Sequence, residues 1–104
     1  MIFDEIDAGV SGRAADKIGR KLKQAALSRQ VLCITHLSQI ASRADAHYLI
    51  EKAVVDDKTY TNVTKLNFSD RVGELARMNG GVSMSQVHLD AARELLIEAG
   101  AEEE

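Results

Sequence analysis

Two short apolar segments separated by an amphipathic stretch constrain the fold of this chain most strongly. Residues 31–35 form a continuous apolar run, which is typical of a parallel strand buried on both faces. Residues 2–4 have the pattern of the end of another strand. Between them, Ser11 can N-cap a helix that runs to about residue 28 with apolar side chains at helical spacing. The chain is therefore predicted to open with a strand, a helix and a second strand in a right-handed parallel unit.

Polar side chains follow both predicted strands at their carboxyl ends. Asp4 and Glu5 end the first strand, and His36 follows the second. In open α/β sheets this edge is where ligands bind. An aspartate there can hold a hydrated magnesium ion, an adjacent glutamate can deprotonate an attacking water, and a histidine can donate a hydrogen bond to a terminal phosphate. The three residues together indicate phosphoryl-transfer chemistry.

The middle of the chain is predicted to form one short helix and several strands. Residues 38–44 favour the helix, and residues 47–52 favour a strand. Residues 53–55 and 59–66 lie on either side of an Asp-Asp-Lys turn and are rich in β-forming residues. They predict a peripheral antiparallel hairpin.

Two helices are predicted to close the chain. The first covers residues 69–79, with Val72, Leu75 and Ala76 facing inward. The second starts with a capping box at residues 83–86 and ends at Gly100. Its predicted inward stripe is Val87, Ala91 and Leu95.

Length and composition set modest bounds. The 104 residues suit one domain over residues 1–100, with residues 101–104 as a frayed acidic tail. A net charge of −3 argues against a basic DNA footprint on this segment itself. The single cysteine, Cys33, lies in an apolar run and fits a reducing cytoplasm. No stretch approaches the roughly 18 consecutive apolar residues of a membrane span, so no membrane role is expected.

Several segments resemble one known family. Residues 3–15, Phe-Asp-Glu-Ile-Asp-Ala-Gly-Val-Ser-Gly-Arg-Ala-Ala, resemble the ABC-type ATPase heads of the SMC-like family. Residues 33–41 resemble the switch-histidine segment of the same heads, and residues 74–78 and 91–96 resemble their C-terminal helices. Within the family, the chain closely resembles a bacterial protein of DNA double-strand break repair and recombination.

The resemblance implies a role for each site residue. Asp4 would be the Walker B aspartate, which contacts the nucleotide site by holding Mg²⁺ through water, and Glu5 would be the catalytic glutamate. His36 would be the second catalytic residue, the switch histidine. Residues 7–11 would form the loop that crosses to a second head when two heads clamp ATP between them. Ser11 stands where many family members have an aspartate, and it is assigned to the cofactor-binding residues through this loop.

The chain lacks other parts that such a head needs. It contains no Gly-x-x-x-x-Gly-Lys-Ser/Thr phosphate loop, no Leu-Ser-Gly-Gly signature and no long heptad segment. The expected fold is therefore the C-terminal lobe of a P-loop ATPase head, with an incomplete, mostly parallel sheet, flanking helices and a peripheral hairpin. In related sheets the phosphate-loop strand would lie between residues 31–35 and 47–52. Its absence predicts a marginal or self-associating chain that cannot hydrolyse ATP alone.

The leading functional hypothesis is a segment of an ATP-hydrolysing DNA repair protein, with ATP and Mg²⁺ bound only in the complete head. Its expected partners are the remainder of its own head, a second head across the nucleotide, and DNA through the full-length protein. The expected location is the cytoplasm, in association with the nucleoid. One alternative is another ABC or SMC-like ATPase, such as one of chromosome organisation. Others are a non-catalytic interaction module, or a mononuclear metal hydrolase built on Asp4, Asp7 and His36.

Overall fold

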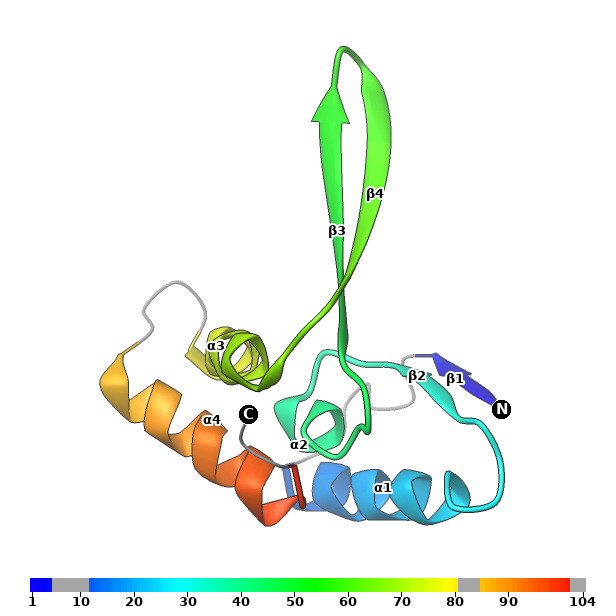
Figure 1. Cartoon of the computed structure of the whole chain (residues 1–104), viewed down its shortest axis with the longest axis vertical. Coiled ribbons are helices and arrows are strands. Elements are labelled where there is room, and N and C mark those ends of the chain that lie inside the picture. The colour runs from blue at the N-terminus through cyan, green and yellow to red at the C-terminus, as the bar shows by residue number, and fades with distance from the viewer. Residues whose placement is uncertain (5–11, 81–84, 102–104) are drawn as a thin grey trace.

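The computed structural model describes residues 1–4, 12–80 and 85–101. In these residues the elements run in the order β1, α1, β2, α2, β3, β4, α3 and α4 (Figure 1). Two of the predicted site residues, Glu5 and Ser11, lie outside the described part, as do Ser83 and Met84 of the predicted capping box. None of the described helices is long and apolar enough to cross a membrane.

The predicted strand, helix and strand at the start of the chain are present. Strand β1 (Ile2–Asp4) pairs in parallel with β2 (Leu32–Ile34), and helix α1 (Gly12–Ala25) connects them. Phe3 lies level with Cys33, and both are half-buried. On the side of α1, an apolar hollow of about 330 Å³ separates Phe3 from the helix.

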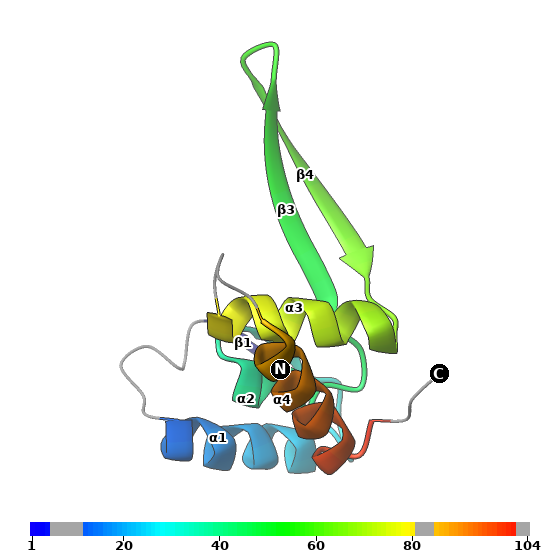
Figure 2. The same cartoon turned by 90° about the vertical axis from the view of Figure 1, so that its left-hand side faces the viewer.

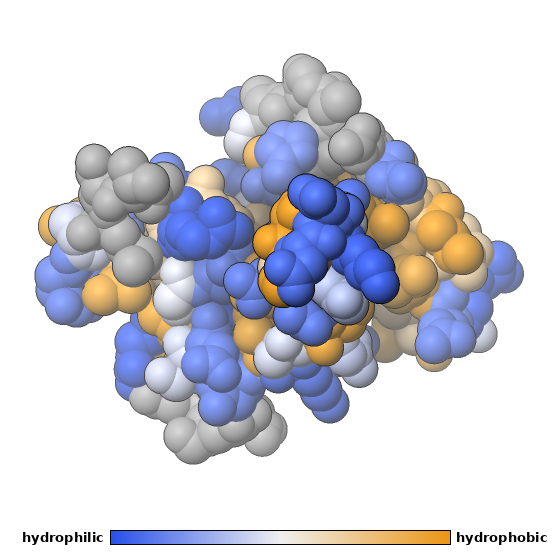
Figure 3. Space-filling view, turned by 90° about the horizontal axis from the view of Figure 1, so that it is seen from above, coloured by the Kyte–Doolittle hydropathy of each residue, from blue (hydrophilic) through white to orange (hydrophobic). Residues whose placement is uncertain are grey.

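The prediction that residues 31–35 are buried on both faces is wrong for this chain. Leu32 and Ile34 are 55% and 43% exposed, and Ile2 beside them is 73% exposed. Because successive side chains of a strand point to opposite faces, these residues share the outer face of the two-stranded sheet. Figure 3 shows apolar surface on the side of the molecule where β1 and β2 lie. The apolar run makes the strand suitable for burial, but no described element covers its outer face.

The predicted hairpin is longer than expected. Strand β3 (Tyr48–Val55) pairs antiparallel with β4 (Lys58–Lys65), so the predicted strand at residues 47–52 is the first half of the hairpin rather than a separate strand. Asp56 and Asp57 form the two-residue turn with φ values of 51° and 63°, the left-handed region that such tight hairpin turns require. The hairpin projects away from the helices (Figures 1 and 2).

The core lies among the helices. Helix α3 (Phe68–Gly80) packs against α4 (Gln86–Glu98), and the short helix α2 (Ser38–Ala41) contributes from the other side of α3. The buried cluster consists of Ala41, Phe68, Leu75, Ala76, Ala92 and Leu96, with Val72 packed at its margin. The predicted inward face of α3 is thus confirmed.

The predicted inward face of α4 is wrong. Ala92 and Leu96 are fully buried, whereas Val87 is 75% exposed and Ala91 is exposed. The helix begins two residues later than the predicted capping box at residues 83–86 implies. Ser85 is its N-cap, and the backbone N–H of Ser85 donates to Nδ1 of His88 at 3.2 Å.

The fold is therefore α/β with incomplete sheets, flanking helices and a peripheral hairpin, as predicted. The strands divide into one parallel pair, β1–β2, and one antiparallel pair, β3–β4. Outside the hairpin, the sheet of the described residues is the parallel pair β1–β2, which agrees with the predicted incomplete, mostly parallel sheet, and β2 does not pair with β3.

Candidate functional site

Two of the predicted site residues lie at one edge of the β1–β2 pair. Asp4 is the last residue of β1 and is level with Ile34, the last residue of β2. His36 follows two residues later along the chain, and both Asp4 and His36 are exposed. Because the strands are parallel, their carboxyl ends meet at the same edge, where open α/β sheets bind ligands. Glu5 directly follows Asp4 in the sequence but, like Ser11, is outside the described residues.

His36 lies in a short connection between β2 and α2. The backbone N–H of Leu37 donates to Oγ1 of Thr35 at 3.1 Å, a local bond that turns the chain. Leu37 occupies the N-cap of α2 with extended backbone angles of −101° and 125° and makes no side-chain cap. The position of His36 is therefore tied at one end to β2 and at the other to α2.

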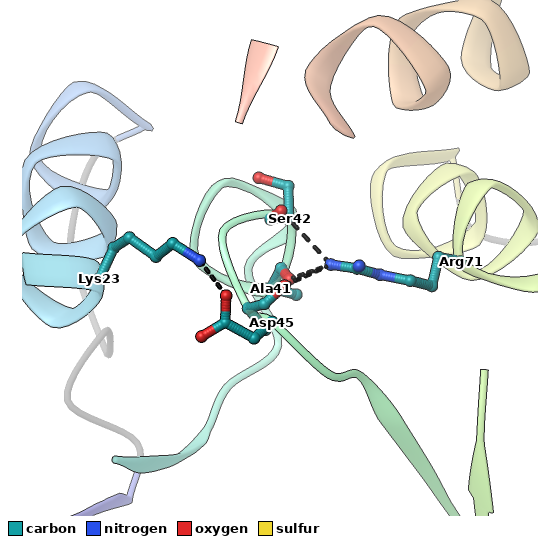
Figure 4. A network of polar contacts seen from close by, with 6 residues as sticks. Lys23, Ala41, Ser42, Asp45 and Arg71 are labelled. Carbon is teal, nitrogen blue, oxygen red and sulfur yellow. Dashed lines mark hydrogen bonds and ion pairs between the residues drawn. The ribbon is translucent and has the colours of Figure 1, made fainter. Parts of the chain in front are cut away.

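Helix α3 holds both ends of α2. At its start, Oγ of Ser38 donates to Oδ1 of Asn79 at 2.7 Å. At its end, Nη2 of Arg71 lies 3.4, 3.4 and 3.0 Å from the carbonyl oxygens of Ala41, Ser42 and Ala44. A guanidinium suits this place because the carbonyl end of a helix carries partial negative charge. Figure 4 shows Arg71 reaching across from α3 toward Ala41 and Ser42.

Helix α1 packs on the opposite side of α2. A Cβ atom on Gly19 would lie 3.1 Å from the carbonyl oxygen of Gln39, so only glycine allows this close approach without a shift. Asp16 of α1 pairs with Arg43 at 3.1 Å, and Lys23 pairs with Asp45 just beyond α2 (Figure 4). The short helix is thus enclosed between α1 and α3 (Figure 2).

Sequence reasoning did not single out these supporting residues, although two of them carried a signal. Gly19 interrupts an otherwise regular amphipathic helix, which often marks a close packing contact. Arg71 stands four residues before Leu75, on the apolar face of α3, where a charged side chain needs a specific partner. Asn79 carried no such signal.

One half-buried histidine, His47, lies near Arg71. Burial and the nearby positive charge of Arg71 lower the pKa of His47, while Glu74 opposes the shift. His47 is therefore neutral near pH 7. The charged residues that act on it, Arg71 and Glu74, both lie on α3.

The described residues hold no group of three or more His, Cys, Asp or Glu side chains that could bind a metal ion by themselves. The exposed carboxylate of Asp4 nevertheless has the chemistry of a magnesium ligand, since Mg²⁺ in phosphate sites takes one or two carboxylates with water and phosphate oxygens. The site thus fits a cation held jointly with a nucleotide.

Three proteins that are similar to this chain in sequence are all named DNA repair protein RecN. The chain is 47% identical over 96 residues to the DNA repair protein RecN of Rickettsia conorii, covering 92% of this chain and 18% of that protein. It is 44% identical over 99 residues to RecN of Bacillus subtilis, covering 95% of this chain and 17% of the relative. For RecN of Haemophilus influenzae the identity is 43% over 96 residues, covering 92% and 17%. No protein-family model matches the chain.

A solved structure has the same fold. It comes from work on the structural biochemistry of ATP-driven dimerization and DNA-stimulated activation of SMC ATPases. The TM-score is 0.60 at 20% sequence identity, and the match covers 76% of this chain and 47% of the other. At this identity the likeness shows the fold alone. The predicted family resemblance is confirmed. The chain, which covers about 18% of the length of such relatives, is a homologue of part of the DNA repair protein RecN, and it has the fold of part of an SMC ATPase head.

Proposed function

We propose that this chain supplies the Walker B strand, the crossing loop and the switch histidine of an ATP-hydrolysing, SMC-like DNA repair protein. The identity to RecN proteins and the SMC ATPase fold support the protein class. The observation that carries the chemistry is the parallel register of β1 and β2, which brings the ends of the two strands bearing Asp4 and His36 to one edge. The proposed process is double-strand break repair and recombination.

Each site residue has a proposed task. Asp4 holds Mg²⁺ through water, and the bound cation neutralises charge on the phosphate oxygens. Glu5 accepts a proton from the attacking water. His36 donates a hydrogen bond to the terminal phosphate and fixes that water. Ser11 contacts the nucleotide from the crossing loop.

The remainder of the head and a second head complete the proposed site. In this proposal another part of the complete head supplies the phosphate loop, because no such motif occurs in these 104 residues. ATP bound between two heads holds them together, and hydrolysis releases them. DNA is bound through the longer protein, in the cytoplasm and on the nucleoid.

The proposal is tested in a complete protein. This chain replaces the matching 99 residues of the Bacillus subtilis RecN, and ATP binding and hydrolysis are measured for the chimera and its variants. Glu5→Gln should keep ATP bound while slowing hydrolysis by about 10²- to 10⁴-fold, the usual contribution of a general base. Glu94→Gln is the matched control, because Glu94 is exposed on α4, away from the strand edge.

The results separate the rival functions. Normal hydrolysis by the Glu5→Gln chimera would reject the catalytic proposal. If the parent chimera folds and pairs with a second head but neither binds nor hydrolyses ATP, the chain is a non-catalytic interaction module. The exposed apolar face of β1 and β2 is the surface such a module would present.

A further inference from the structure

We infer that Arg71 is a positioning residue for His36, acting from α3 through the short helix α2. This inference rests on the proposed function of His36 as the switch histidine. Arg71 is far along the chain from the strand edge and belongs to none of the segments that carry the catalytic residues. Its effect would be mechanical: it fixes the helix to which His36 is attached.

The first step is that α2 cannot hold its own position. The helix has only four residues, and its N-cap residue Leu37 makes no side-chain cap. Isolated helices of this length are not stable in water, because nucleation costs more than a single turn returns. The orientation of α2, and with it the connection that carries His36, must therefore come from its neighbours.

The second step is that α3 fixes α2 at both ends. The Ser38–Asn79 bond of 2.7 Å holds the start of α2, directly after the His36 connection. The Arg71 guanidinium holds the end, with its closest carbonyl, that of Ala44, at 3.0 Å. Ser38 is 2% exposed and Arg71 is 7% exposed. Charged donors in such a dry environment make stronger and more directional bonds than they do in water.

The third step is that α2 also contacts the helix that follows β1. Gly19 packs against the backbone of Gln39 and Ile40, and Asp16 pairs with Arg43. Helix α2 comes after β2, with His36 in the connection between them. Contacts with α1 on one side and with α3 on the other therefore fix the position of α2, and with it the connection that carries His36. Arg71 supplies the contacts from α3 at the end of α2.

The experiment compares Arg71→Met with Arg77→Met in the chimera described above. Arg77 lies on the same helix, but it is exposed, and Glu74 of that helix accepts a hydrogen bond from its Nε at 3.0 Å. Arg71→Met should lower the hydrolysis rate per bound ATP by about tenfold to a hundredfold. It should change the ATP affinity by less than about twofold, because a small displacement of a catalytic group affects the rate more than it affects binding. Arg77→Met should change neither. Arg71→Lys, which keeps one charged donor, should recover part of the rate.

A double-mutant cycle separates positioning from general loss of structure. If Arg71 acts through His36, Arg71→Met should have little further effect once His36→Ala has removed the imidazole. Equal losses in both backgrounds would overturn the inference. So would an unchanged rate per bound ATP in Arg71→Met.

Amide hydrogen exchange of residues 37–42 in the same chimera gives a readout that does not depend on catalysis. Arg71→Met should speed exchange there, whereas Arg77→Met should not. Unchanged exchange would overturn the inference even if the rate fell. If Glu5→Gln still hydrolyses ATP normally, the proposed function is wrong, and the exchange alone then decides whether Arg71 holds α2.

Discussion

Replacing Leu96 by alanine tests the core at the position where the structure departs from the sequence pattern. Leu96 is fully buried in the cluster with Phe68, Leu75 and Ala92. Leu95 next to it is only partly buried, although the sequence pattern placed it on the inward stripe. The two residues are chemically identical and share one helix. Leu96→Ala and Leu95→Ala therefore differ only in what surrounds each side chain.

The magnitude follows from burial and from the neighbours. Fully burying a leucine contributes about 1.5–3 kcal/mol, and the cavity left by truncation raises the total cost to about 2–5 kcal/mol. Several members of the cluster are alanines, which have no flexible side chain to fill the space, namely Ala41, Ala76 and Ala92. We therefore expect Leu96→Ala to cost about 3–5 kcal/mol.

Urea unfolding followed by circular dichroism measures the difference. With a slope of about 1–3 kcal/mol per molar urea, the Leu96→Ala midpoint should fall by at least about 1 M, and Leu95→Ala should lose clearly less. Val87→Ala, at a position that is 75% exposed, should stay within about 0.5 kcal/mol of the parent. A concentration series checks whether self-association contributes. A loss for Leu95→Ala equal to or larger than that for Leu96→Ala would show that the assigned face of α4 is wrong.

Three further predictions concern a helix contact, a buried histidine and a turn. Gly73→Ala should stabilise the chain by about 0.5–1 kcal/mol, because nothing lies within 4 Å of the new Cβ. Gly19→Ala should lose this gain, since its Cβ would lie 3.1 Å from a carbonyl oxygen. Equal urea midpoints for the two variants would contradict the close packing of α1 on α2. Because burial and Arg71 lower the pKa of His47 below its ordinary 6.5, the unfolded chain binds more protons, so the free energy of unfolding should fall as the pH drops from about 6.5 toward the folded-state pKa. His47→Gln should remove that part of the slope in urea titrations at several pH values, and an unchanged slope would assign it to other groups. Asp57→Gly should slow amide exchange in the hairpin. The φ angle at this position is 63°, and glycine adopts it without the cost of about 1 kcal/mol or more that a side chain incurs. Faster exchange would contradict a left-handed backbone at this turn position.

Sequence patterns were sufficient to predict the arrangement of the strand edge and of the local elements. Two apolar segments joined by one helix require parallel strands, and the polar residues after them, Asp4 and His36, must then share an edge. The Asp-Asp turn determined the hairpin. The spacing of Leu75 and Ala76 determined the buried face of α3. The hairpin turn and the buried face of α3 depend on neighbours within a few residues, which is the range that a periodic pattern reports. The pairing of β1 with β2 follows instead from the order of strand, helix and strand.

Contacts between distant elements determine which face of α4 is buried and what supports α2. Helix α4 carries apolar side chains on several of its sides, so periodicity could not predict whether Leu95 or Leu96 is buried. Contact with α3 buries Leu96. The apolar run of β2 likewise indicated that the strand can be buried but not which elements cover it. Arg71 bonds to carbonyls 27 to 30 residues away, a pairing that no local pattern contains. The physical reason is common to all three: burial and hydrogen bonding depend on which surfaces meet when the chain folds.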